Sequence, residues 1–170
     1  VIAYAETDRF DSWPVPEQFF GPDVHDGPNT DIYTNAYSPW PDADAHLMFP
    51  AFFHHGVDTL DVHIMTSRDG FHWQRPLRDP IVPAGEPGSG MEGSNYAGNG
   101  IVSIKPGEWS IPIASTRIGH SECSFLKEGE YESGLANVLL ATWREDGFMS
   151  LEAEAEGKCT TAPITLLGTR

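Results

Sequence analysis

The stretch Ile64–Pro76 reads I-M-T-S-R-D-G-F-H-W-Q-R-P, with Asp69-Gly70 between two apolar runs. An Asp-Gly pair in this setting is a strong hairpin signal, because the central residues of a tight hairpin turn need positive φ. We therefore predict a hairpin centred on Asp69-Gly70. Trp73 follows the turn by three residues, and we expect its ring to fold back and bury apolar area against the sheet.

Two other stretches resemble this one. Thr7–Pro14 places Trp13 60 residues before Trp73, and Trp143–Phe148 repeats Asp-Gly-Phe 77 residues after Asp69-Gly70. Self-similarity at such a spacing indicates an internal structural repeat. Because Asp-Gly turns are common, three unrelated hairpins remain the alternative.

The apolar and alternating segments predict short strands separated by Gly- and Pro-rich turns. These strands are 1–5, a short one ending at 16, 32–37, 46–53, 59–67, one from 71, 101–104, 109–115, 135–143, 148–156 and 160–167, with a long loop over 17–30. Two successive groups each contain four antiparallel strands with Asp-Gly between the third and the fourth, which is typical of propeller blades. A β-sandwich is the alternative. We predict an all-β fold: a partial β-propeller of four-stranded antiparallel blades over 1–147, then the start of a C-terminal β-sandwich or closing strands over 148–170.

The charge of the chain restricts its partners. The net charge is −15, from 25 acidic and 10 basic residues, and such a field repels nucleic acid and anionic lipid. Neutral, hydroxyl-rich ligands fit better, and no apolar run is long enough to span a membrane. The chain opens inside a predicted strand, so we expect a piece of a longer protein whose exposed blade edges make it poorly soluble by itself.

Four segments carry a family resemblance: Thr7-Asp8-Arg9-Phe10-x-x-Trp13, Asp31-Ile32-Tyr33, Ser67–Trp73 and Arg144-x-Asp146-Gly147-Phe148. They resemble the later blades of bacterial proteins similar to family 32 glycoside hydrolases, which share a five-bladed propeller with the family 43 enzymes. Leu140–Leu167 resembles the junction into the β-sandwich of family 32. The resemblance implies a glycosidase acting on fructosides or arabinosides of plant or microbial origin, in a secreted or periplasmic parent protein.

The same resemblance departs from the family at its catalytic motifs. The Asn-Asp-Pro-type motif that carries the family's nucleophile is absent from this sequence. Arg78-Asp79-Pro80 and Glu122-Cys123 match two other family signatures in their letters, but both lie elsewhere in the order of the chain. We therefore expect the nucleophile to lie outside this chain.

Glycoside hydrolysis needs two carboxyl groups facing one sugar bond, about 5–5.5 Å apart for retention and about 6.5–9.5 Å apart for inversion. In a propeller such groups lie where the innermost strands begin, which selects Asp31 and Glu92 as candidate catalytic residues. Ordinary loop carboxylates are the plainer interpretation of both. The candidate substrate-binding residues, chosen for stacking and hydrogen bonding, are Asp26, Tyr33, Asn35, Asn95, Tyr96 and His120.

Two further functions remain open beside hydrolysis. The first is a non-catalytic carbohydrate-binding or scaffolding propeller with the same fold. The second, ranked last, is a sialidase-like protein, because Ser-x-Asp-Gly-x-x-Trp resembles that family's Asp-box although few arginines lie near the candidate site. His54-His55, with His63 and Asp58, is weighed as a metal site and interpreted instead as turn and strand-face residues. No metal and no cofactor is predicted.

Overall fold

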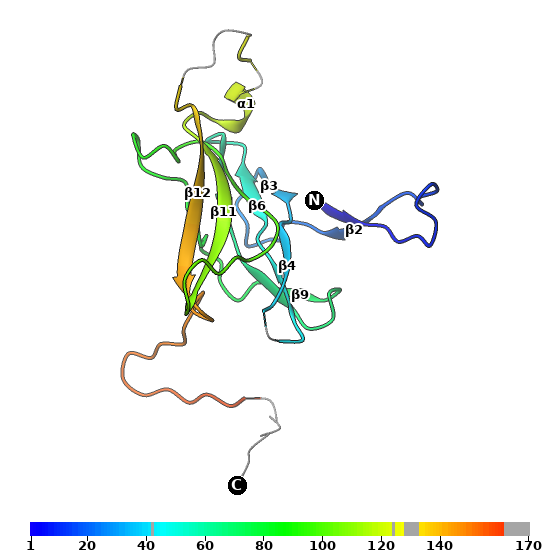
Figure 1. The fold of residues 1–170 in the computed structure, drawn as a ribbon, viewed down its shortest axis with the longest axis vertical. Coiled ribbons are helices and arrows are strands. Elements are labelled where there is room, and N and C mark those ends of the chain that lie inside the picture. Colours follow the sequence, from blue (N-terminus) through cyan, green and yellow to red (C-terminus); the bar gives the residue numbers. More distant parts are fainter. Residues whose placement is uncertain (42, 124, 128–132, 162–170) are drawn as a thin grey trace.

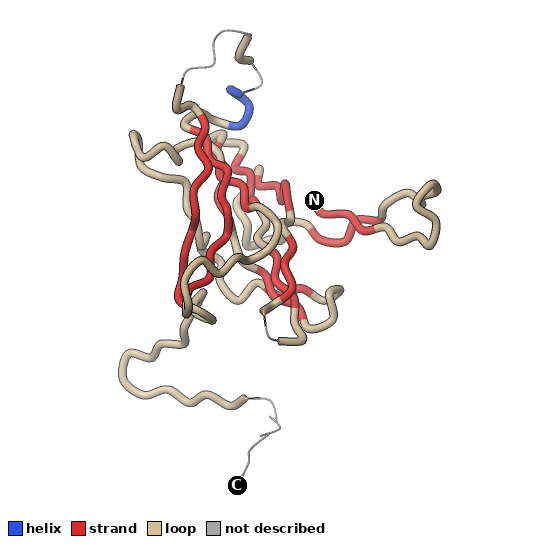
Figure 2. Tube along the Cα trace, in the orientation of Figure 1, coloured by secondary structure: helices blue, strands red, loops and turns tan. Residues whose placement is uncertain are grey.

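The computed structural model describes residues 1–41, 43–123, 125–127 and 133–161. Within these residues the chain forms twelve strands in four small antiparallel sheets and one short helix, α1 (His120–Cys123) (Figures 1 and 2). The predicted all-β class is therefore confirmed. The described strands do not close into a barrel or a ring of blades.

Residues 30–74 fold as an antiparallel meander whose first three segments each contribute to two sheets. One sheet consists of β3 (Thr30–Thr34), β6 (Ala51–His54) and β7 (Thr59–Val62). The other consists of β4 (Tyr37–Pro39), β5 (His46–Met48), β8 (Met65–Ser67) and β9 (Trp73–Gln74). The predicted order of pairing in this region is confirmed, but the predicted strands 32–37, 46–53 and 59–67 are each divided in two.

The divisions lie side by side and form a crease across the meander. Ala36 has a φ of 39°, which takes the chain out of extended geometry. Pro50 has no amide hydrogen to give to a ladder. Hydrogen bonds cross the crease from the Phe49 amide to the Asn35 carbonyl at 3.0 Å and from the His63 amide to the Pro50 carbonyl at 3.0 Å. The crease therefore reorients the strands without leaving these amides unpaired.

Outside the meander, another sheet contains β10 (Asn95–Ala97), β11 (Glu108–Thr116) and β12 (Ala136–Arg144). Figure 1 shows β11 and β12 as the two longest strands. Their antiparallel register places Trp109 opposite Trp143. The strand predicted over 101–104 is wrong, because Val102 forms only an isolated bridge there. The strand that pairs with β11 opposite β12 is instead β10, which ends before the Asn99-Gly100 turn.

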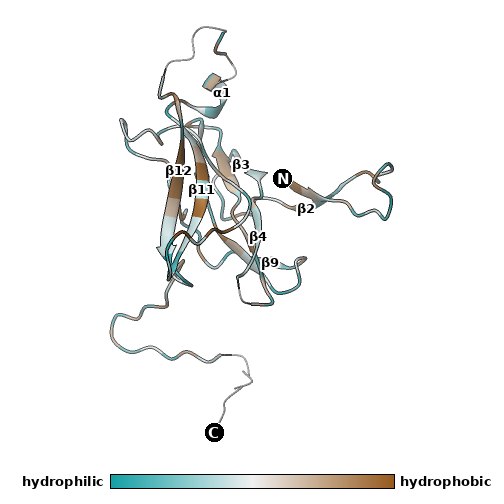
Figure 3. Ribbon diagram, in the orientation of Figure 1, coloured by the Kyte–Doolittle hydropathy of each residue, from teal (hydrophilic) through white to brown (hydrophobic). Residues whose placement is uncertain are grey.

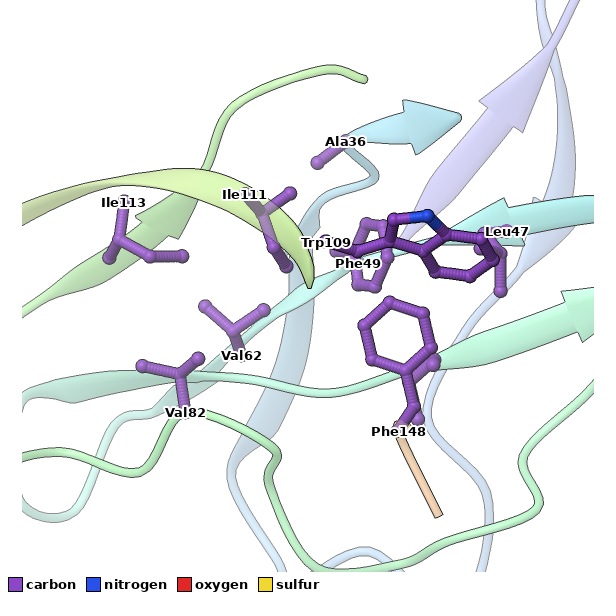
Figure 4. Packing of buried hydrophobic residues seen from close by; sticks show 10 residues of the cluster. Ala36, Leu47, Phe49, Val62, Val82, Trp109, Ile111, Ile113 and Phe148 are labelled. Carbon is purple, nitrogen blue, oxygen red and sulfur yellow. The ribbon is translucent and has the colours of Figure 1, made fainter. Parts of the chain in front are cut away.

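A hydrophobic core joins the β10–β11–β12 sheet to the meander (Figure 4). Ile111 and Ile113 of β11 are fully buried, as is Val62 of β7. The Phe148 ring lies 5.7 Å from the Phe49 ring, which draws the chain beyond β12 into the same core. Full burial of one such side chain stabilises the fold by about 1.5–3 kcal/mol. Figure 3 shows the apolar stretches of β11 and β12 that accompany this packing.

The predicted hairpin at Asp69-Gly70 is confirmed, because β8 pairs with β9 and Ser67 faces Trp73. The loop is longer than a two-residue turn, and only Gly70 of the central pair has positive φ, at 76°. The Asp69 carboxylate organises the loop by accepting hydrogen bonds from the amides of Phe71 at 2.9 Å and His72 at 2.7 Å. The Trp73 indole donates to the Gly70 carbonyl at 3.0 Å.

The first related stretch repeats two hydrogen bonds of this turn, although Arg9 stands where the turn has Asp69. The Trp13 indole donates to the Phe10 carbonyl at 2.8 Å, three residues back, as Trp73 does. The Thr7 hydroxyl accepts from the Arg9 amide at 3.0 Å, as Ser67 does from the Asp69 amide. This loop joins β1 (Ile2–Tyr4) to β2 (Glu17–Phe20), so the strand predicted to end at 16 lies beyond it, inside the predicted loop 17–30.

The second related stretch, with Asp146-Gly147, does not close a hairpin. Asp146 has a φ of 55° and its carboxylate accepts from the Trp40 indole at 3.0 Å. No strand follows over 148–161, where residues 150–161 are exposed, so the strand predicted over 148–156 is wrong. The reason is that Phe148 turns into the core rather than along a ladder. Of the strand predicted over 160–167, residues 162–167 lie outside the described part of the chain.

Among the described residues, none of the helical segments has the length and apolar character needed to cross a bilayer.

Candidate functional site

The sheet β3–β6–β7 carries some polar side chains on each of its two faces, because successive side chains of a strand point to opposite sides. Thr30 pairs with His54 on one face, and Asp31 pairs with Phe53 on the other. The first face continues to Asp61, which pairs with Phe52. We call the first the histidine face and the second the aromatic surface.

The aromatic surface brings together four of the residues selected from the sequence. The Tyr33 ring lies 4.7 Å from the His120 ring and 6.4 Å from the Tyr96 ring. The Tyr96 hydroxyl lies 2.7 Å from Nδ1 of His120. Asp31, on the same strand as Tyr33, lies 2.9 Å from Nε2 of His55. Tyr33 is 52% exposed, so its ring is partly open to solvent beside the His120 imidazole.

Partial burial raises the pKa of the Tyr96 hydroxyl. A protonated hydroxyl can donate its hydrogen bond to Nδ1 of His120 when that nitrogen carries no hydrogen. The imidazole is then held in one orientation beside Tyr33.

Asp58 holds the segment that carries His120. Its carboxylate accepts from the Ser121 amide at 3.0 Å, and its carbonyl accepts from the His120 amide at 3.0 Å. Burial alone would raise the pKa of Asp58, but hydrogen bonds from Ser121 and Glu122 outweigh it and the pKa is lowered. Asp58 is therefore charged at neutral pH and positions the aromatic surface without belonging to it.

The structure does not bring Asp31 and Glu92 together. Asp31 lies on β3, whereas Glu92 lies just before Ser94, which bridges to Leu60 of β7. With β6 and β7 between them, their backbones are about 14 Å apart at a normal strand spacing. Each carboxylate is also engaged locally, Asp31 with His55 and Glu92 with the Gly88 amide, rather than facing the other across one site.

Glu92 also has an environment of its own. Its carboxylate accepts from the Gly88 amide at 2.6 Å and lies 3.9 Å from the Arg117 guanidinium. The pKa of Glu92 is lowered, first by its own backbone amide and then by the amides of Gly88 and Gly90 and the charge of Arg117, with burial opposing. A general acid needs a raised pKa, so this environment does not suit that role.

Three other candidate residues, Asn95, Asn35 and Asp26, lie apart from the aromatic surface. Asn95 is fully buried, where its amide nitrogen donates to the Leu60, Pro83 and Met91 carbonyls and its oxygen accepts from Ser115. Asn35 is exposed at the crease. Asn95 therefore has a structural role, which its place in a turn-rich stretch did not reveal.

Asp26 belongs to a pocket beside the histidine face. Its carboxylate lies 2.5 Å from the Arg75 guanidinium, and both side chains are almost completely buried. The Arg75 guanidinium also lies over the Phe52 ring, 4.4 Å from its centre. The pocket has a volume of about 180 Å³, and its lining includes His54, Asp61 and His63. Because its carboxylate is paired with Arg75, Asp26 is not free to bind a sugar.

A larger groove of about 730 Å³ lies elsewhere, between the two Asp-Gly loops. Its lining includes Trp40, Asp69 and Asp146, whose polar atoms are engaged in the turns described above. None of the candidate site residues selected from the sequence lines this groove.

The residues that sequence reasoning set aside are those of the histidine face. His54 and His63 were weighed with Asp58, but the carboxylate that joins them is Asp61, 3.0 Å from each. The signal was present as Asp61-x-His63, since this spacing places both side chains on one face of a strand. The contribution of His54 depends on strand pairing between β6 and β7.

Comparisons with protein-family models, with curated proteins and with solved structures found no match to this chain.

Proposed function

We propose that this chain belongs to a carbohydrate-active β-propeller protein similar to the family 32 and 43 glycosidases, and that its aromatic surface binds neutral sugars. The observation that carries the proposal is the grouping of Tyr33, Tyr96 and His120, each predicted to bind substrate, on the face that also carries Asp31, predicted as a catalytic carboxylate. An exposed ring stacks on the apolar face of a sugar, and neighbouring carboxylate and imidazole groups bind its hydroxyls.

The repeated indole-capped turn and the four-stranded order of residues 30–74 support the propeller interpretation. Binding is favoured over hydrolysis, because Asp31 and Glu92 are separated by two strands and the pKa of Glu92 is lowered. Asp31 is half-exposed beside His55, as suits a residue that contacts a sugar hydroxyl.

Isothermal titration with fructo-, arabino- and xylo-oligosaccharides tests the proposal, with Tyr33→Ala as the main variant. An aromatic contact contributes about 0.5–1.5 kcal/mol beyond its buried area, so we expect Tyr33→Ala to weaken binding roughly tenfold. Tyr37→Ala is the matched control, because Tyr37 is also exposed and its hydroxyl also meets a histidine, His46 at 2.9 Å.

Two results would contradict the proposal: no binding of any oligosaccharide, or equal losses for Tyr33→Ala and Tyr37→Ala. Release of reducing sugar from the same oligosaccharides is measured in parallel with Asp31→Asn. Turnover that disappears in Asp31→Asn while binding persists would restore the hydrolase interpretation.

A further inference from the structure

We infer that the histidine face binds a divalent transition-metal ion of the zinc type through His54, Asp61 and His63. This site lies on the opposite side of the β3–β6–β7 sheet from the aromatic surface, so it does not depend on the proposed sugar binding. The inference rests on three observations: the convergence of the donor atoms, the burial of unpaired donors, and the adjoining pocket.

The donor atoms converge because strand pairing stacks their side chains. Nε2 of His54 and Nε2 of His63 each lie 3.0 Å from an oxygen of Asp61, one from each oxygen. One donor atom from each of the three residues lies within 4.8 Å of the others. Tetrahedral zinc with ligands at 2.0–2.1 Å holds neighbouring donors about 3.3 Å apart. The spacing between whichever Asp61 oxygen binds the ion and its neighbouring imidazole nitrogen, 3.0 Å, already approaches that value.

The burial of these groups is costly without a ligand. The His63 side chain is only 5% exposed, and no described protein group makes a hydrogen bond to either of its ring nitrogens. Oδ1 of Asp61 is also buried without such a bond, although it lies 3.0 Å from Nε2 of His63. Nε2 of His63 and Oδ1 of Asp61 are therefore close together without forming a hydrogen bond, which is the arrangement of two ligands of one metal ion. A buried polar group without a partner costs about 1–3 kcal/mol, which metal coordination would offset.

The charges around the site permit a cation. The guanidinium groups of Arg75 and Arg78 line the same pocket, but each is paired with a carboxylate, Asp26 and Asp23 respectively. The carboxylate of Asp61 is therefore not matched by an arginine. Two imidazoles and one carboxylate suit zinc, whereas calcium prefers six to eight oxygen ligands.

Three protein ligands leave a fourth position for water or a small ligand, as in catalytic zinc sites. The pocket of about 180 Å³ adjoins the three side chains and is large enough for such a ligand. The structure thus provides an open coordination site rather than a closed structural one.

Titration of the chelator-treated 170-residue chain with Zn²⁺, and with Co²⁺ as a spectroscopic probe, tests the inference. We expect one Zn²⁺ per chain, a rise in Tm on binding, and the visible absorption of low-symmetry four-coordinate Co²⁺. His54→Ala and Asp61→Asn should each weaken Zn²⁺ binding at least tenfold. His54 is only partly buried, so His54→Ala should remain folded, whereas His63→Ala removes a buried side chain and would destabilise the core.

His55→Ala is the matched control, because His55 also places Nε2 2.9 Å from an aspartate oxygen, on the other face of the same sheet and without a second histidine. We expect it to bind Zn²⁺ like the unmodified chain. The inference is overturned if the unmodified chain binds neither metal, or if folded His54→Ala binds as tightly as His55→Ala does.

Discussion

Gly93 is a position where one hydrogen atom decides whether the two parts of the fold meet. Its carbonyl accepts from the Leu60 amide at 3.0 Å, and its amide donates to the Thr116 carbonyl at 2.9 Å. A Cβ at this position would overlap the backbone of Ile118. The residue therefore joins the meander to β11 only because it has no side chain.

Gly93→Ala should lower the free energy of unfolding by at least about 1–3 kcal/mol, because a buried backbone has to move to admit the methyl group. Urea denaturation followed by tryptophan fluorescence measures the loss. Gly56→Ala is the control, since a Cβ there meets nothing within 4 Å, and its effect should stay within about 0.5 kcal/mol. Equal stability of the two variants would rule out this close approach.

The hairpin β8–β9 shows how an element depends on one charged side chain. Asp69 accepts two amide hydrogen bonds and pairs with His72, and these contacts, led by the His72 amide, hold the pKa of Asp69 well below its usual range. A lowered pKa in the folded state means that the stabilisation is complete above the unfolded value of about 3.9. It is lost as the pH falls below that value toward the folded pKa.

We therefore expect Asp69→Ala to lower the Tm at pH 7, with a difference from the unmodified chain that narrows as the pH falls below about 4. Thermal unfolding at a series of pH values gives both curves. Asp8→Ala, at an exposed position in the related N-terminal loop, is the control. A Tm difference that does not change with pH would mean that the Asp69 charge does not hold this turn.

β12 has an exposed apolar face, with Val138 81% and Leu140 51% exposed. It is an edge strand of its described sheet. Such a strand favours pairing with another chain, which agrees with the poor solubility expected from the sequence.

At the scale of the whole molecule, two ion pairs tie the loop before β3 to the segment after β9. Asp26 and Arg75 are almost completely buried, whereas Asp23 and Arg78 are nearly half-exposed. Hydrogen bonds and charge from Arg78 lower the pKa of Asp23 to about 2. Solvent nevertheless screens the exposed pair, so its contribution to stability is small.

Asp26→Ala should cost about 3–5 kcal/mol of unfolding free energy, because it leaves the Arg75 charge buried without a partner. Asp23→Ala, which removes the neighbouring exposed pair, should cost much less. Chemical denaturation of both variants and of Asp26→Ala/Arg75→Met measures the difference. If Asp26→Ala and Asp23→Ala lose the same stability, Asp26 is not the buried anchor of this loop.

The sequence by itself determined the elements whose chemistry is local. Asp69-Gly70 and Thr7–Trp13 form their turns through side chains within six residues, and alternation along β11 and β12 sets which side chains face the core. The four-stranded order of residues 30–74 followed from the same patterns.

Only the tertiary structure decided contacts between distant residues: the crease that divides the strands, the turn of Phe148 into the core, and the separation of Asp31 from Glu92. The same holds for His54, which meets Asp61 and His63 because β6 pairs with β7, and sequence spacing alone does not fix such a register.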